Sequence, residues 1–138
     1  MENFCVHPLR VYYEDTDAAG IVYYANHLRF IERGRTEFLR SLGHDQHRLM
    51  QEGVAFAVRS ANVEFLKPAR LDDLLTVETR IVALGRAQLT FSQRILRRQE
   101  LLLDAKIRIA CIDPAVGRPI RMPRALHDQL SALPGLSQ

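Results

Sequence analysis

The spacing of apolar residues changes once along this chain of 138 residues, from the period of a helix to that of a strand. Between residues 26 and 42 they recur every three or four positions, which predicts one long amphipathic helix. From residue 54 to residue 112 they largely alternate with polar residues, which predicts several consecutive strands. One long helix beside a run of strands favours an α+β domain in which an antiparallel sheet packs on the helix.

Capping and turn residues set the expected boundaries. Asn26 is the predicted N-cap of the long helix, Gly43 its C′ residue, and Pro123 the start of a terminal helix that runs to residue 133. The remaining elements are expected at residues 8–14 (strand), 15–20 (turn), 45–51 (short helix) and, as strands, 54–58, 62–66, 74–82, 89–95 and 105–112. Because only short breaks separate these strands, we expect sequence neighbours to pair as an antiparallel meander.

Length and composition narrow the class of protein. A chain of this size is expected to form one domain, residues 1–138. Its apolar runs fall far short of the roughly 18 residues that a membrane span needs, and no export signal is recognisable. Cys5 and Cys111 lie too far apart for a metal or redox motif, so no metal is expected. These features predict a cytoplasmic protein with two free thiols. A sheet of this kind leaves edge strands, so an oligomer is expected.

The positive charge of the chain is almost entirely arginine. The formal net charge is +3, and only Lys67 and Lys106 among the 19 basic residues are lysine. Arginine suits bidentate contact with phosphates, which fits a phosphorylated substrate or cofactor. Since the charges are spread along the chain, no nucleic-acid partner is expected.

Carboxylates gather between the first predicted strand and the long helix. Glu14, Asp15 and Asp17 precede Gly20, two tyrosines and His27. A carboxylate there can attack an acyl carbonyl or activate a water molecule, while amides at a helix start can stabilise an oxyanion. Alternation along an extended chain would place Asp15 and Asp17 on the same side, with Asp15 in a structural role. The alternative for Asp17 is a turn-capping aspartate.

Several blocks of sequence together resemble one enzyme family. They are Arg10-Val11, Tyr12-Tyr13-Glu14-Asp15-Thr16-Asp17-Ala18-Ala19-Gly20-Ile21-Val22-Tyr23-Tyr24-Ala25-Asn26, Glu32-Arg33-Gly34-Arg35-Thr36-Glu37, Val63-Glu64-Phe65 and Pro68-Ala69-Arg70-Leu71-Asp72-Asp73. They resemble the 4-hydroxybenzoyl-CoA thioesterase family of hotdog-fold enzymes, and within it the Tol–Pal-associated (YbgC-type) acyl-CoA thioesterases. The resemblance covers residues 8 to about 124.

This resemblance implies a hotdog fold, with a long central helix wrapped by a five- or six-stranded antiparallel sheet. It implies hydrolysis of an acyl-CoA thioester to free CoA and a carboxylic acid, without a metal or redox cofactor. Asp17 occupies the catalytic position, as nucleophile or general base. Tyr24 and His27 are implied near the substrate, and Arg59 and Arg86 are candidates for the CoA phosphates. Homodimers with active sites at the subunit interface, usually paired into homotetramers, are also implied.

The sequence leaves alternatives for the polarising amide, the acyl pocket and the function. The amide that polarises the thioester belongs either to residues 24–27 or, by the resemblance, to residues 53–56. The acyl pocket has four candidate side chains, Tyr24, Phe30, Phe38 and Phe56. The alternative functions are a non-catalytic binder of acyl-CoA or acyl carrier protein, and a thioester hydratase or dehydratase that uses His27 and Glu32.

Overall fold

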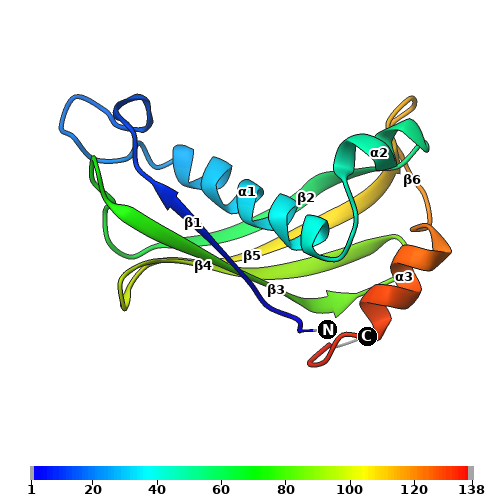
Figure 1. Ribbon diagram of the computed structural model, residues 1–138. Helices are drawn as coiled ribbons and strands as arrows, with labels where there is room; N and C mark the ends of the chain where they lie inside the picture. Colours follow the sequence, from blue (N-terminus) through cyan, green and yellow to red (C-terminus); the bar gives the residue numbers. More distant parts are fainter. Residues whose placement is uncertain (1, 137–138) are drawn as a thin grey trace.

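A curled antiparallel sheet wraps around one long helix in the computed structural model, which describes residues 2–136 (Figure 1). The strands are β1 (Cys5–Arg10), β2 (Ala55–Phe65), β3 (Leu74–Leu84), β4 (Gln88–Arg97), β5 (Glu100–Asp113) and β6 (Arg118–Pro119). The helices are α1 (Asn26–Ser41), α2 (Gln46–Gln51) and α3 (Arg124–Ser131), with a 3₁₀ turn at Tyr13–Asp15. The predicted α+β hotdog architecture is therefore confirmed. The remaining residues of the predicted 1–138 domain, 1 and 137–138, lie outside the described part.

The order of the strands corrects the predicted meander. The order across the sheet is β1-β3-β4-β5-β2, with β6 paired to β5. The strands β3, β4 and β5 are a meander as expected, but β2 pairs with β5 rather than with its sequence neighbour β3. The residues between β2 and β3 carry the chain from one side of the sheet to the other, and β2 becomes an edge strand.

Several predicted strand boundaries were also wrong. The strand β5 starts at Glu100, five residues before the predicted residue 105. The two strands predicted at 54–58 and 62–66 are one strand, β2, with a register shift between Val58 and Ser60. The first strand ends at Arg10 instead of residue 14. Its predicted continuation turns into the 3₁₀ segment, because the Asp15 carboxylate accepts a hydrogen bond from Tyr12 N at 2.8 Å.

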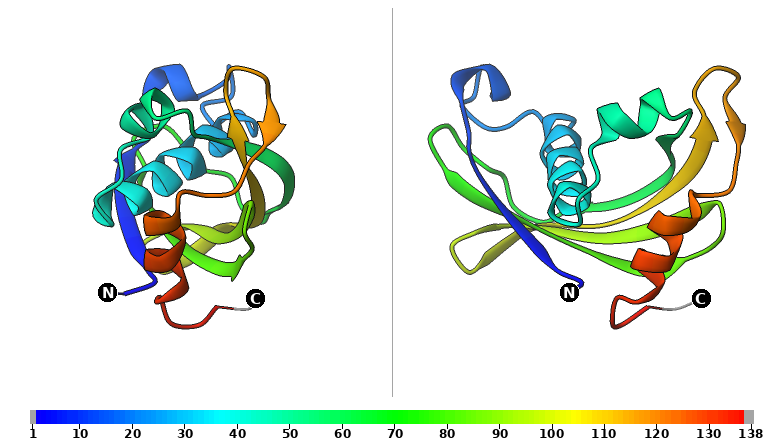
Figure 2. Two further views of the ribbon diagram at one scale, coloured as in Figure 1. Left: turned by 90° about the vertical axis from the view of Figure 1, so that its right-hand side faces the viewer. Right: turned by 45° about the vertical axis from the view of Figure 1, so that its right-hand side comes forward.

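The helix α1 lies in the hollow of the sheet (Figure 2). Its inner face buries Phe30, Ile31, Phe38 and Leu39. Gly34 sits so close to the sheet that a Cβ added at this position would lie 2.6 Å from a side-chain carbon of Val77. The absence of a Cβ at this glycine is what lets the helix lie this close to the sheet.

One buried polar network joins α1 to the sheet beside that glycine. Gln93 Nε2 donates to Ile31 O at 2.7 Å and to Thr79 Oγ1 at 2.9 Å, while Gln93 Oε1 accepts from Arg35 Nη1 at 3.0 Å. Burial lowers the pKa of Arg35, an effect that Glu32 partly offsets. Every polar atom of the Gln93 side chain thus has a partner, which is what a fully buried amide requires.

The helix ends lie within two residues of the predicted ones, with α3 ending at Ser131 instead of residue 133, and the predicted capping residues agree with one exception. Gly43 has φ +91° after α1, and Asp45 caps α2 by accepting from His47 N at 2.8 Å. The exception is Asn26, which is the first residue of α1 and not its N-cap; Ala25 holds that position. The Asn26 side chain instead donates to Asp15 O at 2.9 Å and ties the helix to the carboxylate-rich segment. Across residues 2–136, none of the helices combines the length and apolar character needed to cross a membrane.

Candidate active site

Asp17 stands at the start of a tight turn and is exposed. Its backbone closes the turn, since Asp17 N donates to Ile21 O at 2.9 Å and Gly20 N donates to Asp17 O at 3.0 Å. Gly20 has φ +77°, a conformation that glycine adopts at little cost. One carboxylate oxygen, Oδ1, accepts from Ala19 N at 2.8 Å. Within residues 2–136 the other oxygen, Oδ2, has no hydrogen-bond partner, so it is available to a substrate or water.

A neighbouring loop holds the turn in place by backbone hydrogen bonds. Val22 N donates to Ala69 O at 2.8 Å, and Leu71 N donates to Gly20 O at 3.1 Å. Ile21 and Arg70 form an isolated antiparallel bridge between these two contacts. The position of the Asp17 turn therefore depends on the loop that precedes β3.

Asp15 serves the local structure. It is only 9% exposed, its carboxylate accepts from Tyr12 N, and its carbonyl accepts from Tyr23 N at 3.2 Å. The structural role expected for Asp15 fits these contacts. The expectation that Asp15 and Asp17 share a side was wrong, because the 3₁₀ turn at Asp15 breaks the extended chain on which it rested.

The start of α1 offers two free backbone donors. The amides of Asn26, His27 and Leu28 donate to the carbonyls of residues 23, 24 and 25. Within the described chain, the amides of Tyr24 and Ala25 donate to no protein acceptor. They lie at the positive end of the helix dipole, where an oxyanion is stabilised. In the other candidate segment, Gly53 N and Val54 N are already bonded to Met50 O and Leu49 O.

Tyr24 and His27 meet the end of β2. The Tyr24 ring is exposed and lies edge-on to Phe65, with centroids 5.9 Å apart. His27 is only 4% exposed, and its ring lies 5.5 Å from the Phe65 ring. His27 Nδ1 lies 3.0 Å from Tyr24 O and is assigned as the donor, since a carbonyl only accepts. His27 is thus a buried ring at the start of α1, packed against the end of β2.

Burial lowers the pKa of His27 below its usual 6.5, against the smaller opposite effect of Tyr24 O. The unfolded chain therefore binds the proton more readily, and the stability that His27 contributes is present above about pH 6.5 and lost as the pH falls through its folded value. We expect the melting temperature to fall less between about pH 7.5 and pH 5 in His27→Asn, which cannot take up that proton.

The same change at His47, whose side chain is exposed, is the control. Thermal unfolding followed by circular dichroism at each pH provides the measurement. Equal losses in wild type and His27→Asn would contradict a role for the buried imidazole in the acid sensitivity.

Arg59, Arg86 and the Asp17 turn belong to three different parts of the fold. Arg59 is exposed on the edge strand β2, at its register shift. Arg86 is exposed in the turn after β3, whereas the Asp17 turn pairs with the loop before β3. Because β3 has 11 residues at roughly 3.3 Å each, Arg86 and Asp17 lie at opposite ends of the sheet.

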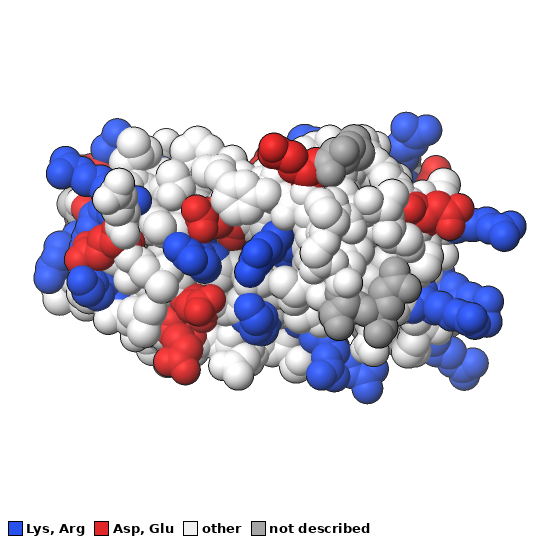
Figure 3. Space-filling view, turned by 90° about the horizontal axis from the view of Figure 1, so that it is seen from below, with Lys and Arg blue, Asp and Glu red and all other residues white. Residues whose placement is uncertain are grey.

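The Arg86 end of the molecule is basic. Arg86, Arg121, Arg124 and His127 line one surface hollow there, together with Asp128. Figure 3 shows Lys and Arg side chains at the end of the molecule that carries α3, and others at the opposite end interspersed with Asp and Glu. This cluster can attract phosphate groups, although within one chain it is remote from Asp17.

A cavity of about 200 Å³, which the sequence did not reveal, lies between the helices and the sheet. Its lining is Glu32, Arg35, Leu39, Gln46, Phe56, Val58, Leu89, Phe91 and Ile109. Of the four candidates for the acyl pocket, Phe56 lines this cavity, while Phe30 and Phe38 are fully buried in the core and Tyr24 is exposed near Phe65. The cavity needs side chains from α1, α2, β2, β4 and β5 together, and no local sequence signal predicts that these elements meet.

A helix wrapped by a curled antiparallel sheet, with a carboxylate turn beside the helix start, defines the hotdog class. The chain belongs to the thioesterase-like superfamily, whose family model matches residues 11–130. It is 46% identical over 120 residues to the acyl-CoA thioester hydrolase YbgC of Escherichia coli O6:H1, covering 86% of this chain and 90% of that protein. It is 42% identical over 125 residues to the acyl-CoA thioesterase YbgC of Haemophilus influenzae, covering 90% and 92%.

Solved structures agree with this assignment. A probable thioesterase from Bartonella henselae superposes with a TM-score of 0.82 at 42% identity, covering 87% of this chain and 99% of that one. The 4-hydroxybenzoyl-CoA thioesterase of Pseudomonas sp. strain CBS-3 superposes with a TM-score of 0.83 at 25% identity, covering 93% and 99%. The predicted family is thereby confirmed, and so is the predicted likeness to its YbgC-type members.

Proposed function

We propose that this protein is an acyl-CoA thioesterase that hydrolyses a CoA thioester to free CoA and a carboxylic acid, with Asp17 as the catalytic carboxylate. One observation carries the proposal. The Asp17 carboxylate is exposed in a turn that backbone hydrogen bonds fix, and one of its oxygens is free within the described chain. The 46% identity to a YbgC acyl-CoA thioester hydrolase supports the substrate class.

Two routes are open to this carboxylate. Asp17 can attack the thioester carbonyl, form a mixed anhydride and expel the CoA thiolate, after which water hydrolyses the anhydride. Alternatively, Asp17 takes a proton from a water molecule that attacks the carbonyl. In both routes the free amides of Tyr24 and Ala25 are suited to hold the oxyanion. Because a thiolate leaves readily, neither route requires a metal or a redox cofactor.

We assign the remaining contacts of the substrate by the chemistry of the residues. The cavity that includes Phe56 offers apolar walls for an acyl group, and Tyr24 and His27 meet Phe65 at the start of α1, a few residues along the chain from Asp17. We assign Arg59 and the Arg86 cluster to the CoA phosphates, with Arg86 supplied by another copy of the chain since it is far from its own Asp17. Acyl-CoA as substrate and two free thiols fit a cytoplasmic protein.

This arrangement needs two copies of the chain, and the open edge of β2 is suited to pairing them. In the part of the chain that the structure describes, β2 bonds to β5 on one side only, and most of its residues, including Val58, are exposed. We expect light scattering to give at least twice the 15.8 kDa of one chain. Val58→Asp would place like charges near the shared edge and shift the protein toward the monomer. A monomeric wild type would contradict this assembly, and four copies would fit pairing of such dimers.

Thiol release from a panel of acyl-CoAs, from short-chain to palmitoyl and hydroxybenzoyl, tests the proposed function. Turnover by the wild type on at least one member is the expected result. Equilibrium binding without turnover across the panel would favour the non-catalytic binder. Turnover of acyl groups on acyl carrier protein alone would correct the carrier and leave the thioester chemistry in place.

A further inference from the structure

The loop of residues 67–73, called here the 67–73 loop, connects the Asp17 turn to the sheet. On one side it receives the turn through Val22 N–Ala69 O, Leu71 N–Gly20 O and the Ile21–Arg70 bridge. These contacts use only backbone atoms, so the turn follows wherever the 67–73 loop is held. The side chains that hold this loop therefore influence the position of the Asp17 carboxylate.

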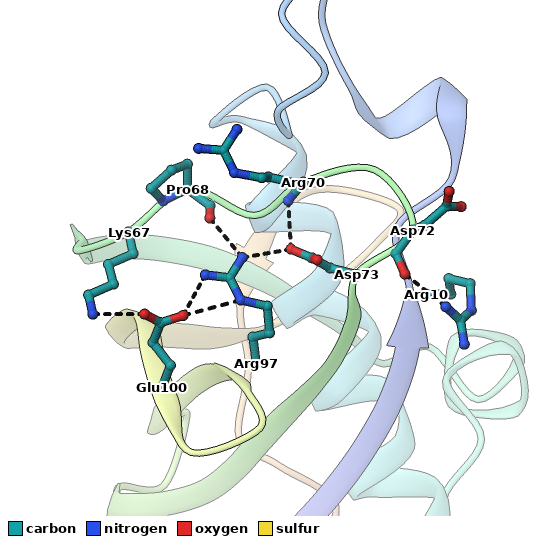
Figure 4. Close-up of polar contacts among 8 residues, drawn as sticks. All are labelled: Arg10, Lys67, Pro68, Arg70, Asp72, Asp73, Arg97 and Glu100. Carbon is teal, nitrogen blue, oxygen red and sulfur yellow. Dashed lines mark hydrogen bonds and ion pairs between the residues drawn. The ribbon is translucent and has the colours of Figure 1, made fainter.

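Asp73 makes the hydrogen bonds that close the loop on itself. Its Oδ2 accepts from Arg70 N at 2.8 Å, and its own amide donates to Arg70 O at 3.1 Å. This pair of hydrogen bonds closes the loop at the residue that bridges to Ile21. The same Oδ2 also accepts from Arg97 Nη1 at 2.7 Å, which links the loop to the end of β4 (Figure 4).

The Arg97 guanidinium donates to three partner residues. Besides Asp73, its Nη1 donates to Pro68 O at 3.3 Å, and its Nε donates to Glu100 Oε1 at 3.1 Å. Glu100 in turn binds Lys67 Nζ at 2.8 Å, so both ends of this chain of contacts reach the 67–73 loop (Figure 4). The carboxylates of Asp73 and Glu100 raise the pKa of Arg97. A planar guanidinium can satisfy these partners together, whereas an ammonium group cannot.

Val11, the residue after β1, and Arg10, the last residue of β1, hold the other side of the loop. Val11 N donates to Asp73 O at 2.9 Å and Asp72 N donates to Val11 O at 3.0 Å. Arg10 Nη1 donates to Asp72 O at 2.8 Å, where the backbone of Asp72 has φ +71°. The loop is thus held on both sides. The hydrogen bonds with Val11 join backbone atoms, whereas those with Arg97 on the opposite side use its side chain.

We propose that Asp73 and Arg97 are positioning residues of the active site, which hold the 67–73 loop and through it the Asp17 turn at the place where the carboxylate meets the thioester. The inference rests on the proposed function of Asp17. Neither residue contacts the Asp17 side chain, so neither is assigned a chemical step. The set of contacts that defines them is separate from the cavity beside α1 and from the start of α1.

The expected effect is on turnover rather than on stability. The Arg97 and Asp73 side chains are 27% and 20% exposed, and ion pairs near the surface contribute little to stability. A displacement of a catalytic group by about 1 Å, however, can reduce a rate by roughly 10²-fold. We therefore expect Arg97→Ala to lower kcat about tenfold or more, with KM and the melting temperature nearly unchanged.

Amide hydrogen exchange followed by NMR measures the loop directly, without reference to activity. In Arg97→Ala we expect faster exchange at Val22 and Leu71, whose amides bond across the turn and the loop, and unchanged exchange in the middle of β4. Asp73→Asn should produce the same pattern, because it weakens the contact with Arg97. Arg97→Lys keeps the charge but not the fork of donors, and should fall between wild type and Arg97→Ala in both readouts.

The matched control is Arg94→Ala. Arg94 is on the same strand and pairs with Glu78 on β3 at 3.4 Å, but contacts nothing in the 67–73 loop. Its exchange pattern and kcat should equal those of wild type. If Arg97→Ala does not fold, Arg97→Lys and Asp73→Asn carry the test.

The possible outcomes distinguish failure of the positioning role from failure of the proposed function of Asp17. Faster exchange at Val22 and Leu71 together with a lower kcat supports the positioning role. Unchanged exchange, or faster exchange with an unchanged kcat, overturns it even if Asp17 proves essential. Equal turnover by Asp17→Asn and wild type overturns the proposed function, and the positioning role with it, whatever the exchange shows.

Discussion

Replacing Asp17 by asparagine is expected to lower the rate of thiol release by roughly 10²- to 10⁴-fold, the range for loss of a positioned acid or base. The substitution should leave the turn intact. An asparagine Oδ1 can accept from Ala19 N as the carboxylate does, and the hydrogen bonds that close the turn come from the backbone. What disappears is the charge on the free oxygen, which both proposed routes need.

Glu14→Gln is the matched control for this experiment. Glu14 is an exposed carboxylate three residues away, so its loss changes the local charge by the same amount. We expect its turnover and melting temperature to equal those of wild type. The assignment of Asp17 fails if Asp17→Asn folds normally and hydrolyses the best acyl-CoA as fast as wild type. It also fails if Glu14→Gln loses as much activity as Asp17→Asn.

Much of the fold followed from local signals, because those signals act within a few residues. The apolar spacing of α1 and the glycine after it each concern one helix or one turn. The place of β2 could not be obtained in this way. Its apolar alternation suits any sheet neighbour, and pairing with β5 instead of β3 is decided by how the chain crosses the sheet after β2.

In the candidate site too, features set by neighbouring residues were predictable and features set by distant strands were not. The Asp17 turn was predictable, since Gly20 and the carboxylates lie within a few residues of each other. The burial of His27 was not, because Phe65, the ring that covers it, is on a distant strand. For Arg86, the sequence predicted a suitable residue type but not its position. Its residue type suits a phosphate, but only the length of β3 reveals that it lies at the other end of the sheet from Asp17.

Gly34 is the point where the helix and the sheet come closest, and it sets the second large expected effect. A Cβ at this position would lie 2.6 Å from Val77 Cγ1, 2.7 Å from Thr79 Oγ1 and 3.0 Å from Gln93 Nε2. Two of these residues, Thr79 and Gln93, belong to the buried polar network that joins α1 to the sheet. A methyl group here would therefore push against a stiff β-branched side chain and against hydrogen-bonded partners at once.

Two opposing effects decide the result of Gly34→Ala. Alanine favours a helix over glycine by about 1 kcal/mol, so helix propensity alone predicts a more stable protein. Overpacking of a close-packed core costs typically about 1–3 kcal/mol. Because three contacts would be at or below 3.0 Å, we expect the packing cost to prevail. The free energy of unfolding should fall by about 1–2 kcal/mol, and the melting temperature by roughly 5 °C.

Denaturant unfolding of Gly34→Ala, Val77→Ala and the double variant measures this balance. Val77→Ala removes the methyl group that the new Cβ would meet first, so the cost of Gly34→Ala should be smaller in that background. Equal costs in both backgrounds would mean that the Val77 contact is not the cause. A more stable Gly34→Ala would mean that α1 moves away from the sheet without loss, and that helix propensity, not close approach, governs this position.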